Sequence, residues 1–564
     1  MMNKKTWIGI IVGIGIGLLA ITAILLLLFL PSSQNAFPYE NTPYQVVVNG
    51  NVRTDVTVIN GERYFSWQLV RDAIDPYLWW DANGETITIT NGSGVWDYTE
   101  QDGVLLQNGT AYVSEGFLKK AYGVAPTYIA ENDLSFWLED TFYMGVATSL
   151  KQTLCIRQEP SLKSPRVQVI SKCKGEQVAY ILDATNYGWY RVVSFTGEVG
   201  FVPCEQVSYS KNELFDREKK GVNTETPGAN FGAPKFLEDF SNEKINMVWE
   251  AVYSRNPDTE AIGDMEGLDV IAPTWFTLED AQGTISCLAS KEYVDWAHAR
   301  GYAVWGTVQS YFSDPEVTSA MLHDMVVRRQ FIEQLISYAN EYDLDGINVD
   351  FENMKEADKW LFTQFVRELM VACRKNNLVL SVCCTALSTS SYWSLCYDRP
   401  SLAASVDYLC VMLYDQHGAG SQVAGSVSQL SWMKQSLNSL LKQIPAEKII
   451  MGMPFYTRLW KSEPQEDGTV KMTSSALYME DAAAWVAQRE ITPVWDEESG
   501  QFYVSYVEGD ITYEMWLEDR TSIEKRVALV SQYDLAGCAA WRRGFETADI
   551  WPAIAEGLLK QYNT

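Results

Sequence analysis

The chain contains few of the side chains that bind transition metals. Its 564 residues include three histidines, His298, His323 and His417, and no two of its ten cysteines form a C-x-x-C pair. Zinc sites draw on closely spaced cysteines and histidines, and a catalytic triad needs a histidine that serves a nucleophile. Neither pattern is present, so the sequence predicts no metal site and no cofactor. Cys155, Cys173 and Cys204 share one small region, where a disulfide pairing stays open.

Positive charge is also scarce. The chain has 44 Lys and Arg residues and 72 Asp and Glu residues, which gives a formal net charge of -28. Such a chain repels nucleic acids and anionic membrane surfaces, so we expect no nucleic-acid partner. A neutral ligand fits this charge better. Aromatic residues make up 13% of the chain, and their faces suit flat apolar surfaces such as those of sugar rings.

Charge is absent from a long run near the N-terminus. Residues 7–30 carry no charged side chain, and 24 uncharged, largely apolar residues are enough to span a bilayer as a helix. Lys4 and Lys5 precede this run, and the next basic residue is Arg53, which places residues 1–6 in the cytoplasm. The alternative is a cleaved signal peptide, but its apolar region is normally shorter and residues 33–36 are a poor cleavage site. The sequence therefore predicts a single-pass membrane anchor at 7–30, a linker at 31–43, and everything after it on the extracellular side.

Residues 44–144 alternate short β-type runs with Asn-Gly turns. The sequence NGERYFS at 60–66 recurs as NGTAYVS at 108–114, and each copy runs into a helix-like segment. The pattern resembles the small domain named after the N-terminal part of copper amine oxidases. This region has no His and no Cys, so it is not expected to bind copper. We interpret it as a duplicated α+β stalk or wall-contact domain.

Residues 145–208 have the pattern of a compact β unit. The sequences GWYRV at 188–192 and GEVGFV at 197–202 resemble a bacterial SH3-like barrel. The resemblance implies a cell-wall targeting role, although Trp189 and Tyr190 are equally explained as core residues. A polar stretch at 209–236 is predicted to be a linker.

From residue 237 to 564, strand-like and helix-like patterns alternate. Eight strands that alternate with helices predict an α/β fold, a (β/α)8 barrel, with an α+β insertion at 461–515. The two β-rich regions and the transmembrane helix would precede it. The apolar runs are at 245–252, 270–276, 303–308, 346–351, 378–385, 408–414, 449–455 and 537–541.

The fourth of these runs carries acids on one face. Ile347, Val349 and Phe351 alternate with Asn348, Asp350 and Glu352 in the sequence DGINVDFE. Active sites of parallel barrels lie at the C-terminal ends of their strands. The acids are therefore expected at the rim of the barrel, with Glu352 last, whereas Asp345 begins the strand and is expected to be structural.

This run resembles the D-x-x-D-x-D-x-E signature of glycoside hydrolase family 18. Companion motifs follow in order, namely MLYD at 412–415, GMPFYTR at 452–458 and AW at 540–541, and PTWF at 273–276 further resembles the bacterial branch of spore-cortex and cell-wall N-acetylglucosaminidases. The resemblance implies that Glu352 is the acid, that Asp350 orients the substrate acetamide, and that Tyr414 donates to its carbonyl. It also implies that Asp415, Met412, Tyr456, Arg458, Trp541, Trp275 and Asn348 bind the sugar.

Asn348 departs from the signature, because the family has an acid at this position. Asn cannot titrate, so Asp350 lacks the repulsion of a second carboxylate and is expected to ionise more readily. We expect activity to be retained with a different acid limb of the pH profile.

The sequence as a whole predicts a membrane-anchored hydrolase on the bacterial surface that cleaves β-linked N-acetylglucosamine glycans. Peptidoglycan is the expected substrate, with chitin as the alternative. Two further readings stay open: a lectin-like barrel without catalysis, and a wall anchor whose small β-rich domains are the functional parts. The sequence does not indicate an oligomeric state.

Overall fold

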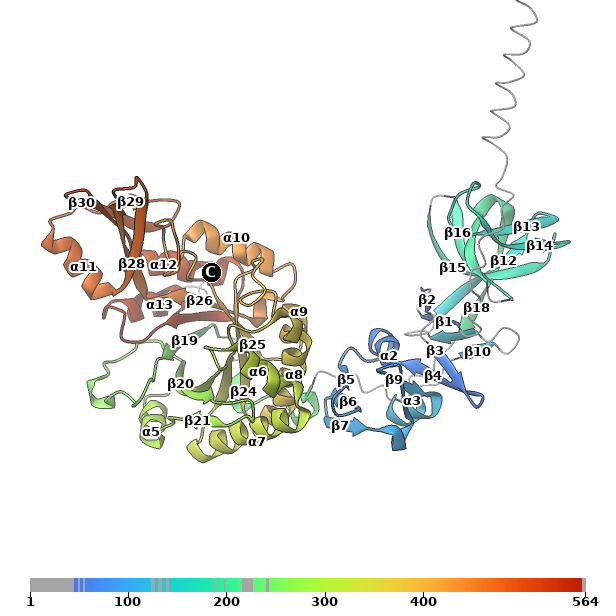
Figure 1. Ribbon diagram of the computed structural model, residues 1–564, viewed down its shortest axis with the longest axis horizontal. Helices are drawn as coiled ribbons and strands as arrows, with labels where there is room; N and C mark the ends of the chain where they lie inside the picture. Colours follow the sequence, from blue (N-terminus) through green and yellow to red (C-terminus); the bar gives the residue numbers. More distant parts are fainter. Residues whose placement is uncertain are drawn as a thin grey trace, which may run out of the picture. The chain divides into compact units, whose positions relative to one another are not determined.

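The computed structural model describes residues 45–48, 51–53, 56–122, 127–129, 134–137, 142–186, 188–196, 198–215, 227–239 and 243–559 (Figure 1). The chain forms two compact units, one within residues 1–80 and 98–223 and the other within 81–97 and 224–564. The predicted tail, anchor and linker at 1–43 lie outside the described residues. None of the helices in the described part of the chain has the length and apolar character needed to cross a bilayer.

Eight parallel strands form a closed barrel within residues 243–559 (Figure 1). They follow one another in chain order, and the first strand pairs with both the second and the eighth. Each coincides with one of the predicted runs, so the predicted (β/α)8 barrel is confirmed. The strands are β19 Ile245–Glu250, β20 Val270–Leu278, β22 Ala303–Gln309, β23 Gly346–Asp350, β24 Val379–Thr385, β25 Tyr408–Met412, β26 Ile449–Pro454 and β32 Gly537–Trp541.

The barrel closes where β32 meets β19. A Cβ at position 537 would collide with the backbone of Ile245, so the close approach of these two strands requires Gly537. One apolar cluster fills the barrel interior, with Met247, Trp249 and Trp305 among its members. A larger cluster lies between the strands and the surrounding helices. The strands are therefore apolar on both faces, as buried parallel strands require.

Helices surround the barrel (Figure 1). Asp324 begins the longest of them by accepting hydrogen bonds from the backbone N–H groups of Val326 and Val327. The helices are α4 Lys235–Asp239, α5 Lys291–Ala299, α6 Pro315–His323, α7 Met325–Tyr342, α8 Lys359–Lys375, α9 Arg399–Ala403, α10 Leu430–Leu440, α12 Arg520–Gln532 and α13 Ile550–Leu559, and the short strand β21 Ile285–Cys287 pairs with β20.

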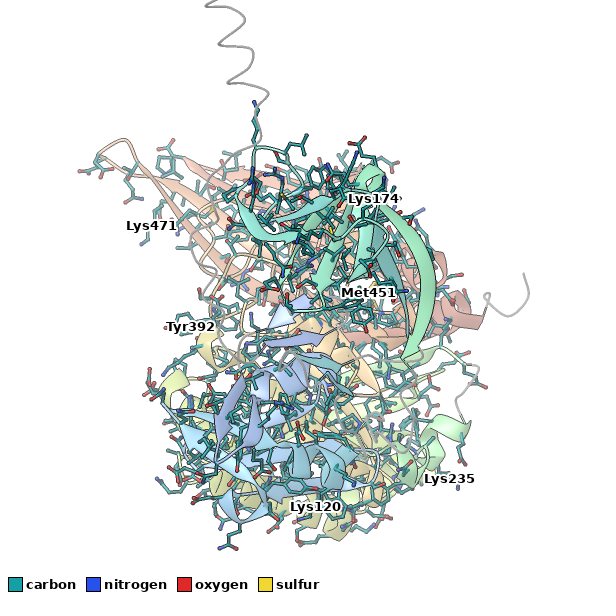
Figure 2. The ribbon with its side chains drawn as sticks, turned by 90° about the vertical axis from the view of Figure 1, so that its right-hand side faces the viewer. Lys120, Lys174, Lys235, Tyr392, Met451 and Lys471 are labelled. Carbon is teal, nitrogen blue, oxygen red and sulfur yellow. The ribbon has the colours of Figure 1, made fainter. Side chains whose placement is uncertain are left out.

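The predicted α+β insertion follows the seventh barrel strand. It is a five-stranded antiparallel sheet with one helix, and Lys471 of β28 is labelled in Figure 2. Trp460 is fully buried and donates from its indole N–H to the Gly425 carbonyl at 2.8 Å. This contact attaches the insertion to the loop after β25. Its elements are β27 Tyr456–Pro464, β28 Val470–Tyr478, α11 Met479–Gln488, β29 Val494–Asp496, β30 Gln501–Glu508 and β31 Ile511–Leu517.

In the other unit, the two copies of the repeat fold alike. Each ends in a serine, Ser66 or Ser114, whose hydroxyl accepts a backbone N–H and begins the following helix. The strands of the two copies pair with each other, Phe65 opposite Val113. The elements are β1 Gln45–Val48, β2 Asn51–Arg53, β3 Val56–Ile59, β4 Glu62–Ser66, α2 Trp67–Ala73, β8 Val104–Gln107, β9 Thr110–Ser114, α3 Glu115–Tyr122, β10 Thr127–Ile129 and β11 Leu134–Trp137.

A seven-stranded antiparallel sheet occupies residues 142–215, a longer span than the predicted 145–208. Tyr190 is partly buried against the core of this sheet, as one of the two interpretations expected. The resemblance to SH3-like domains stays a prediction. The strands are β12 Phe142–Ser149, β13 Thr153–Arg157, β14 Arg166–Ser171, β15 Gln177–Asn186, β16 Trp189–Ser194, β17 Val199–Pro203 and β18 Val207–Phe215.

Residues 81–97 belong with the barrel by their contacts. They include β6 Thr86–Asn91 and most of β7 Gly94–Tyr98, while β5 Leu78–Asp81 ends where they begin. Gln364 of α8 donates to the Thr90 hydroxyl at 3.2 Å, and Arg329 of α7 pairs with Asp97. The predicted 44–144 domain therefore runs across the division between the two units.

Candidate active site

A cleft of about 1010 Å³ opens at the C-terminal ends of the barrel strands. Carboxylates and aromatic rings both line it, which is the combination that a polar ring with apolar faces requires. Its lining includes Trp249, Gln309, Phe312, Asp350, Glu352, Thr385, Leu387, Ser388, Trp393, Met412, Tyr414, Asp415, Gln416, Trp432 and Trp541.

Glu352 lies two residues beyond the end of β23, where its backbone is held on both sides. Ser310 accepts from the Glu352 N–H at 3.0 Å and donates to the Glu352 carbonyl at 2.8 Å. Tyr397 donates to the Phe351 carbonyl at 2.7 Å. Burial raises the pKa of the Glu352 carboxyl well above its usual range, and the charges of Asp350 and Asp415 raise it further. A carboxyl with a raised pKa keeps its proton to a higher pH than an ordinary glutamate and is suited to act as a general acid.

Asp350 is the last residue of β23 and is 7% exposed. Its Oδ1 atom is buried and has no hydrogen-bond partner among the described residues. Burial raises the pKa of Asp350, while hydrogen bonds with Cys383 and Gln309 oppose the rise. A buried acceptor without a donor is costly, so a donor supplied by a ligand in the cleft would satisfy it.

Asn348 does not line the cleft, in contrast to its predicted role in substrate binding. It is fully buried one layer below Asp350, and its Nδ2 donates to Ser381 at 2.8 Å. Its Oδ1 accepts from Trp249 at 3.0 Å and from Thr307 at 3.3 Å. The amide therefore fixes the indole of Trp249. Burial raises the pKa of Asp350, and the expectation that it ionises more readily than it would beside a second carboxylate stays a prediction.

Tyr414 and Asp415 line the cleft from the end of β25. Asp415 has a left-handed backbone conformation, with φ at 56°, and its Oδ1 accepts from the Tyr456 hydroxyl at 2.6 Å. Arg458 lies farther along the same strand as Tyr456, where its Nε donates to Ser474 at 2.9 Å. Tyr456 thus reaches the cleft through Asp415, whereas Arg458 is not among the lining residues.

Trp541 lines the cleft, where it was predicted to lie, and a second tryptophan, Trp249, lies close to it. The ring centroids of Trp541 and Trp249 are 6.3 Å apart. Met412 also lines the cleft. Trp275 does not, because it is 1% exposed and packs outward against Tyr293 of α5, with its indole N–H bound to Asn256 at 2.6 Å.

Several lining residues were not predicted. Trp249 and Gln309 lie at the C-terminal ends of β19 and β22, where the location of barrel active sites would have indicated them. Phe312, Trp393 and Trp432 lie beyond the strand ends, so strand patterns do not locate them. Phe312 and Trp393 are 56% and 38% exposed and form an edge-to-face pair with ring centroids 5.7 Å apart.

The remaining polar candidates lie elsewhere. Asp345 accepts from the Val304 N–H at 2.7 Å and lies 2.9 Å from Nε2 of His298, at the opposite end of β23. His417 hydrogen-bonds the Ser426 carbonyl through Nδ1 at 2.9 Å. Within the described part of the chain, no group of three or more His, Cys, Asp or Glu side chains is arranged to hold a metal ion. All ten cysteines are free.

The sequence comparisons bear on this arrangement. Residues 313–546 match the sequence model of Glycosyl hydrolases family 18. The chain carries a family 18 glycosyl hydrolase domain. Asp350, Glu352, Tyr414, Asp415 and Trp541 all lie within the matched range, so the cleft belongs to the hydrolase domain.

Bacterial relatives resemble this family 18 domain. The uncharacterized glycosylase YvbX of Bacillus subtilis is 27% identical over 51% of this chain and 85% of its own length. The cortical fragment-lytic enzyme of Bacillus subtilis is 24% identical over 43% of this chain, which spans 57% of that relative. The crystal structure of the spore cortex-lytic enzyme SleL of Bacillus megaterium aligns with a TM-score of 0.50 and 19% identity, covering 62% of this chain and 77% of that chain. This last likeness concerns the fold alone.

Proposed function

We propose that the family 18 domain hydrolyses β-linked N-acetylglucosamine glycans, and that peptidoglycan is its substrate. The observation that carries this proposal is the unpartnered Oδ1 of Asp350 near Glu352, whose carboxyl has a raised pKa, in a cleft lined by aromatic rings. An N-acetylated sugar supplies an amide N–H, the type of donor that Oδ1 lacks.

The reaction uses the substrate as nucleophile. Glu352 gives its proton to the glycosidic oxygen as the bond from that oxygen to C1 breaks. The carbonyl oxygen of the 2-acetamido group bonds to C1 and forms an oxazolinium ion, as in the substrate-assisted exceptions among glycosidases. Asp350 accepts the acetamide N–H and stabilises the positive charge.

Hydrolysis then completes the cycle. Glu352, now a carboxylate, takes a proton from water, and the oxygen of that water bonds to C1 as the oxazolinium ring opens. Because C1 is attacked twice from opposite faces, the product keeps the β configuration. Glu352 is protonated again at the end.

Other lining residues position the sugar. Tyr414 donates from its hydroxyl to the acetamide carbonyl, since burial raises the pKa of this phenol well above its usual range and keeps it protonated. Asp415 accepts a sugar hydroxyl while Tyr456 holds it in place. Trp541 forms the floor beneath the ring, and Met412 lies beside it.

Peptidoglycan is proposed over chitin for reasons outside the cleft. The relatives include a cortical fragment-lytic enzyme, and residues 145–208 resemble SH3-like wall-targeting domains. The uncharged run at 7–30, preceded by two lysines, supports a single-pass anchor. The catalytic domain is then held outside the cytoplasmic membrane of a bacterium, next to the wall.

The test replaces Glu352 by Gln, which keeps the shape of the side chain and removes its proton chemistry. Turnover of peptidoglycan and of chitin oligosaccharides should fall by about 10²–10⁴-fold while binding persists. Glu356→Gln, the same change in an exposed residue outside the cleft, should leave turnover unaltered. Full turnover by Glu352→Gln would refute the mechanism. Binding without turnover by the unaltered protein would instead support a lectin.

A further inference from the structure

Arg542 directly follows the cleft tryptophan Trp541 and has no acidic partner. Among the described residues, nothing forms an ion pair or a side-chain hydrogen bond with it. The next residue, Arg543, differs because Glu250 accepts from its guanidinium and neutralises it. Of the two consecutive arginines that follow β32, one is therefore paired with an acid and the other is not.

Aromatic rings hold the unpaired guanidinium in place. The Cζ atom of Arg542 lies 4.1 Å from the ring centroid of Phe545 and 5.6 Å from that of Tyr253. Phe545 is itself stacked on Tyr478, with centroids 4.1 Å apart, and contacts Tyr456. Stacking on a ring fixes the plane of the guanidinium and leaves the N–H groups at its edge free to donate.

These contacts connect Arg542 to the cleft in two ways. The backbone connects it to Trp541, and Phe545 connects it to Tyr456, whose hydroxyl binds the cleft residue Asp415 at 2.6 Å. Tyr253 is 78% exposed, so this side of Arg542 is open to solvent. Arg542 itself is not among the lining residues of the cleft, so the parts of a glycan that it can meet are those that extend past a ring bound at Trp541.

The charge of the chain makes this site unusual. The chain has a formal net charge of -28, yet this cation, next in sequence to a cleft residue, has no ion pair with an acid among the described residues. A planar fork of N–H donors fits a carboxylate best, because both oxygens can accept at once. Chitin carries no carboxylate, whereas peptidoglycan carries lactyl-linked peptides with several.

We propose that Arg542, held by Phe545 and Tyr253, is a carboxylate-binding subsite that selects glycans bearing acidic peptides over neutral ones. The proposal rests on the proposed function of the cleft. Arg542 takes no part in bond breaking, so its contribution is to substrate binding and to the choice between substrates.

The test compares two substrates with the full-length protein. One is peptidoglycan glycan with intact peptides, and the other is a neutral chitin oligosaccharide. Arg542→Gln should lower the ratio of kcat/KM for the peptide-bearing glycan to that for the neutral one by about tenfold, mainly through KM. Arg542→Lys keeps the charge and should restore part of the ratio.

A matched control is available in the insertion. Arg489 is also stacked between two rings, 4.2 Å from the centroid of Trp485 and 5.6 Å from that of Tyr506, but unlike Arg542 it has no cleft-lining residue next to it in the chain. Arg489→Gln should leave the ratio as it is. For the unaltered protein, a higher salt concentration should raise KM for the peptide-bearing glycan more than KM for the neutral one, because salt screens the contact between the guanidinium and a carboxylate.

The outcomes separate the two proposals. If the unaltered protein cleaves neither glycan, the proposed function fails and the subsite fails with it. If it cleaves both and Arg542→Gln leaves the ratio unchanged, or lowers both activities equally, only the subsite is refuted. A selective loss for the peptide-bearing glycan that Arg489→Gln does not reproduce supports it.

Discussion

Asp350 and Glu352 are two residues apart, but the structure gives their carboxyls different surroundings. Burial raises the pKa of both carboxyls, but hydrogen bonds with Cys383 and Gln309 oppose the rise for Asp350, whereas two nearby acids add to it for Glu352. One group is thus fitted to accept a hydrogen bond and the other to give a proton. In glycosidases, surroundings that push the pKa values of two carboxyls apart assign the role of the acid to the carboxyl with the higher pKa.

The charge of Asp415 should be visible in the pH profile. It raises the pKa of Glu352, so Asp415→Asn should lower that pKa and move the alkaline limb of kcat/KM to lower pH, by up to about one unit. Tyr456→Phe removes the hydrogen bond to Asp415 and keeps the charge, so the limb should stay in place for this control. An unmoved limb in Asp415→Asn would contradict the electrostatic account.

Asn348 offers a second test at this scale. Its Oδ1 accepts from Trp249 and Thr307, and an aspartate can keep both bonds while Ser381 turns its hydroxyl to donate. Asn348→Asp places a second carboxyl on the same strand face as Asp350, which raises the pKa of Asp350. We expect activity to be retained and the acid limb to move to higher pH. A pH–rate curve identical to that of the unaltered protein would rule this out.

The sequence located six of its ten predicted site residues in the cleft lining, because strand parity and position at the strand end are local properties. Asn348 lies on the same face of β23 as Asp350, but it is one layer farther into the barrel and does not reach the cleft. Trp275 has the opposite parity to Val270 and Ala272, which point into the barrel, so alternation alone would have placed it outside. Phe312 and Trp393 depend on loop paths, which no local pattern specifies.

At the scale of single elements, α12 shows how the insertion and barrel are joined. Arg526 and Glu518 are both fully buried and lie 2.8 Å apart. Gln501 of β30 and Ser522 also donate to Glu518, each at 2.8 Å. Glu518 therefore has a structural role, outside the cleft lining.

Breaking this pair should be costly. Arg526→Met leaves Glu518 buried without its counter-charge and should lower the free energy of unfolding by about 3–5 kcal/mol. Arg520→Ala on the same helix removes an exposed pair with Glu524 and should cost at most about 1 kcal/mol. Urea unfolding of both variants measures the difference. If both variants lost the same free energy of unfolding, burial of the Arg526–Glu518 pair would not explain its contribution to stability.

At the scale of the whole molecule, residues 81–97 extend the barrel unit. Arg328 is fully buried, pairs with Glu368 at 2.9 Å and lies 3.6 Å from Asp81. Arg329 pairs with Asp97. A segment more than 100 residues before the first barrel strand thus supplies charges that two barrel arginines need.

Neutralising these acids should destabilise the barrel. The double change Asp81→Asn and Asp97→Asn should lower its free energy of unfolding by about 1–3 kcal/mol, since buried cations lose partners. The control is Asp102→Asn in the other unit, where the partner Lys120 is 63% exposed. Denaturant unfolding followed by tryptophan fluorescence reports the change. An equal effect of Asp102→Asn would contradict the assignment.

The eight barrel strands were predictable because each is a short apolar run that alternates with a helical pattern. The association of 81–97 with the barrel was not, because its β-type runs match those of the neighbouring repeat. What distinguishes this segment is a set of contacts with α7 and α8, far away in the chain. Long-range pairing of this kind leaves no periodic signal in the sequence.

The central claim is that Glu352 cleaves peptidoglycan at N-acetylglucosamine. The most direct measurement is mass spectrometry of the products released from purified peptidoglycan by the full-length protein. We predict soluble fragments that end in a reducing N-acetylglucosamine, and none with Glu352→Gln. Fragments that end in N-acetylmuramic acid, or equal release by the variant, would contradict the account.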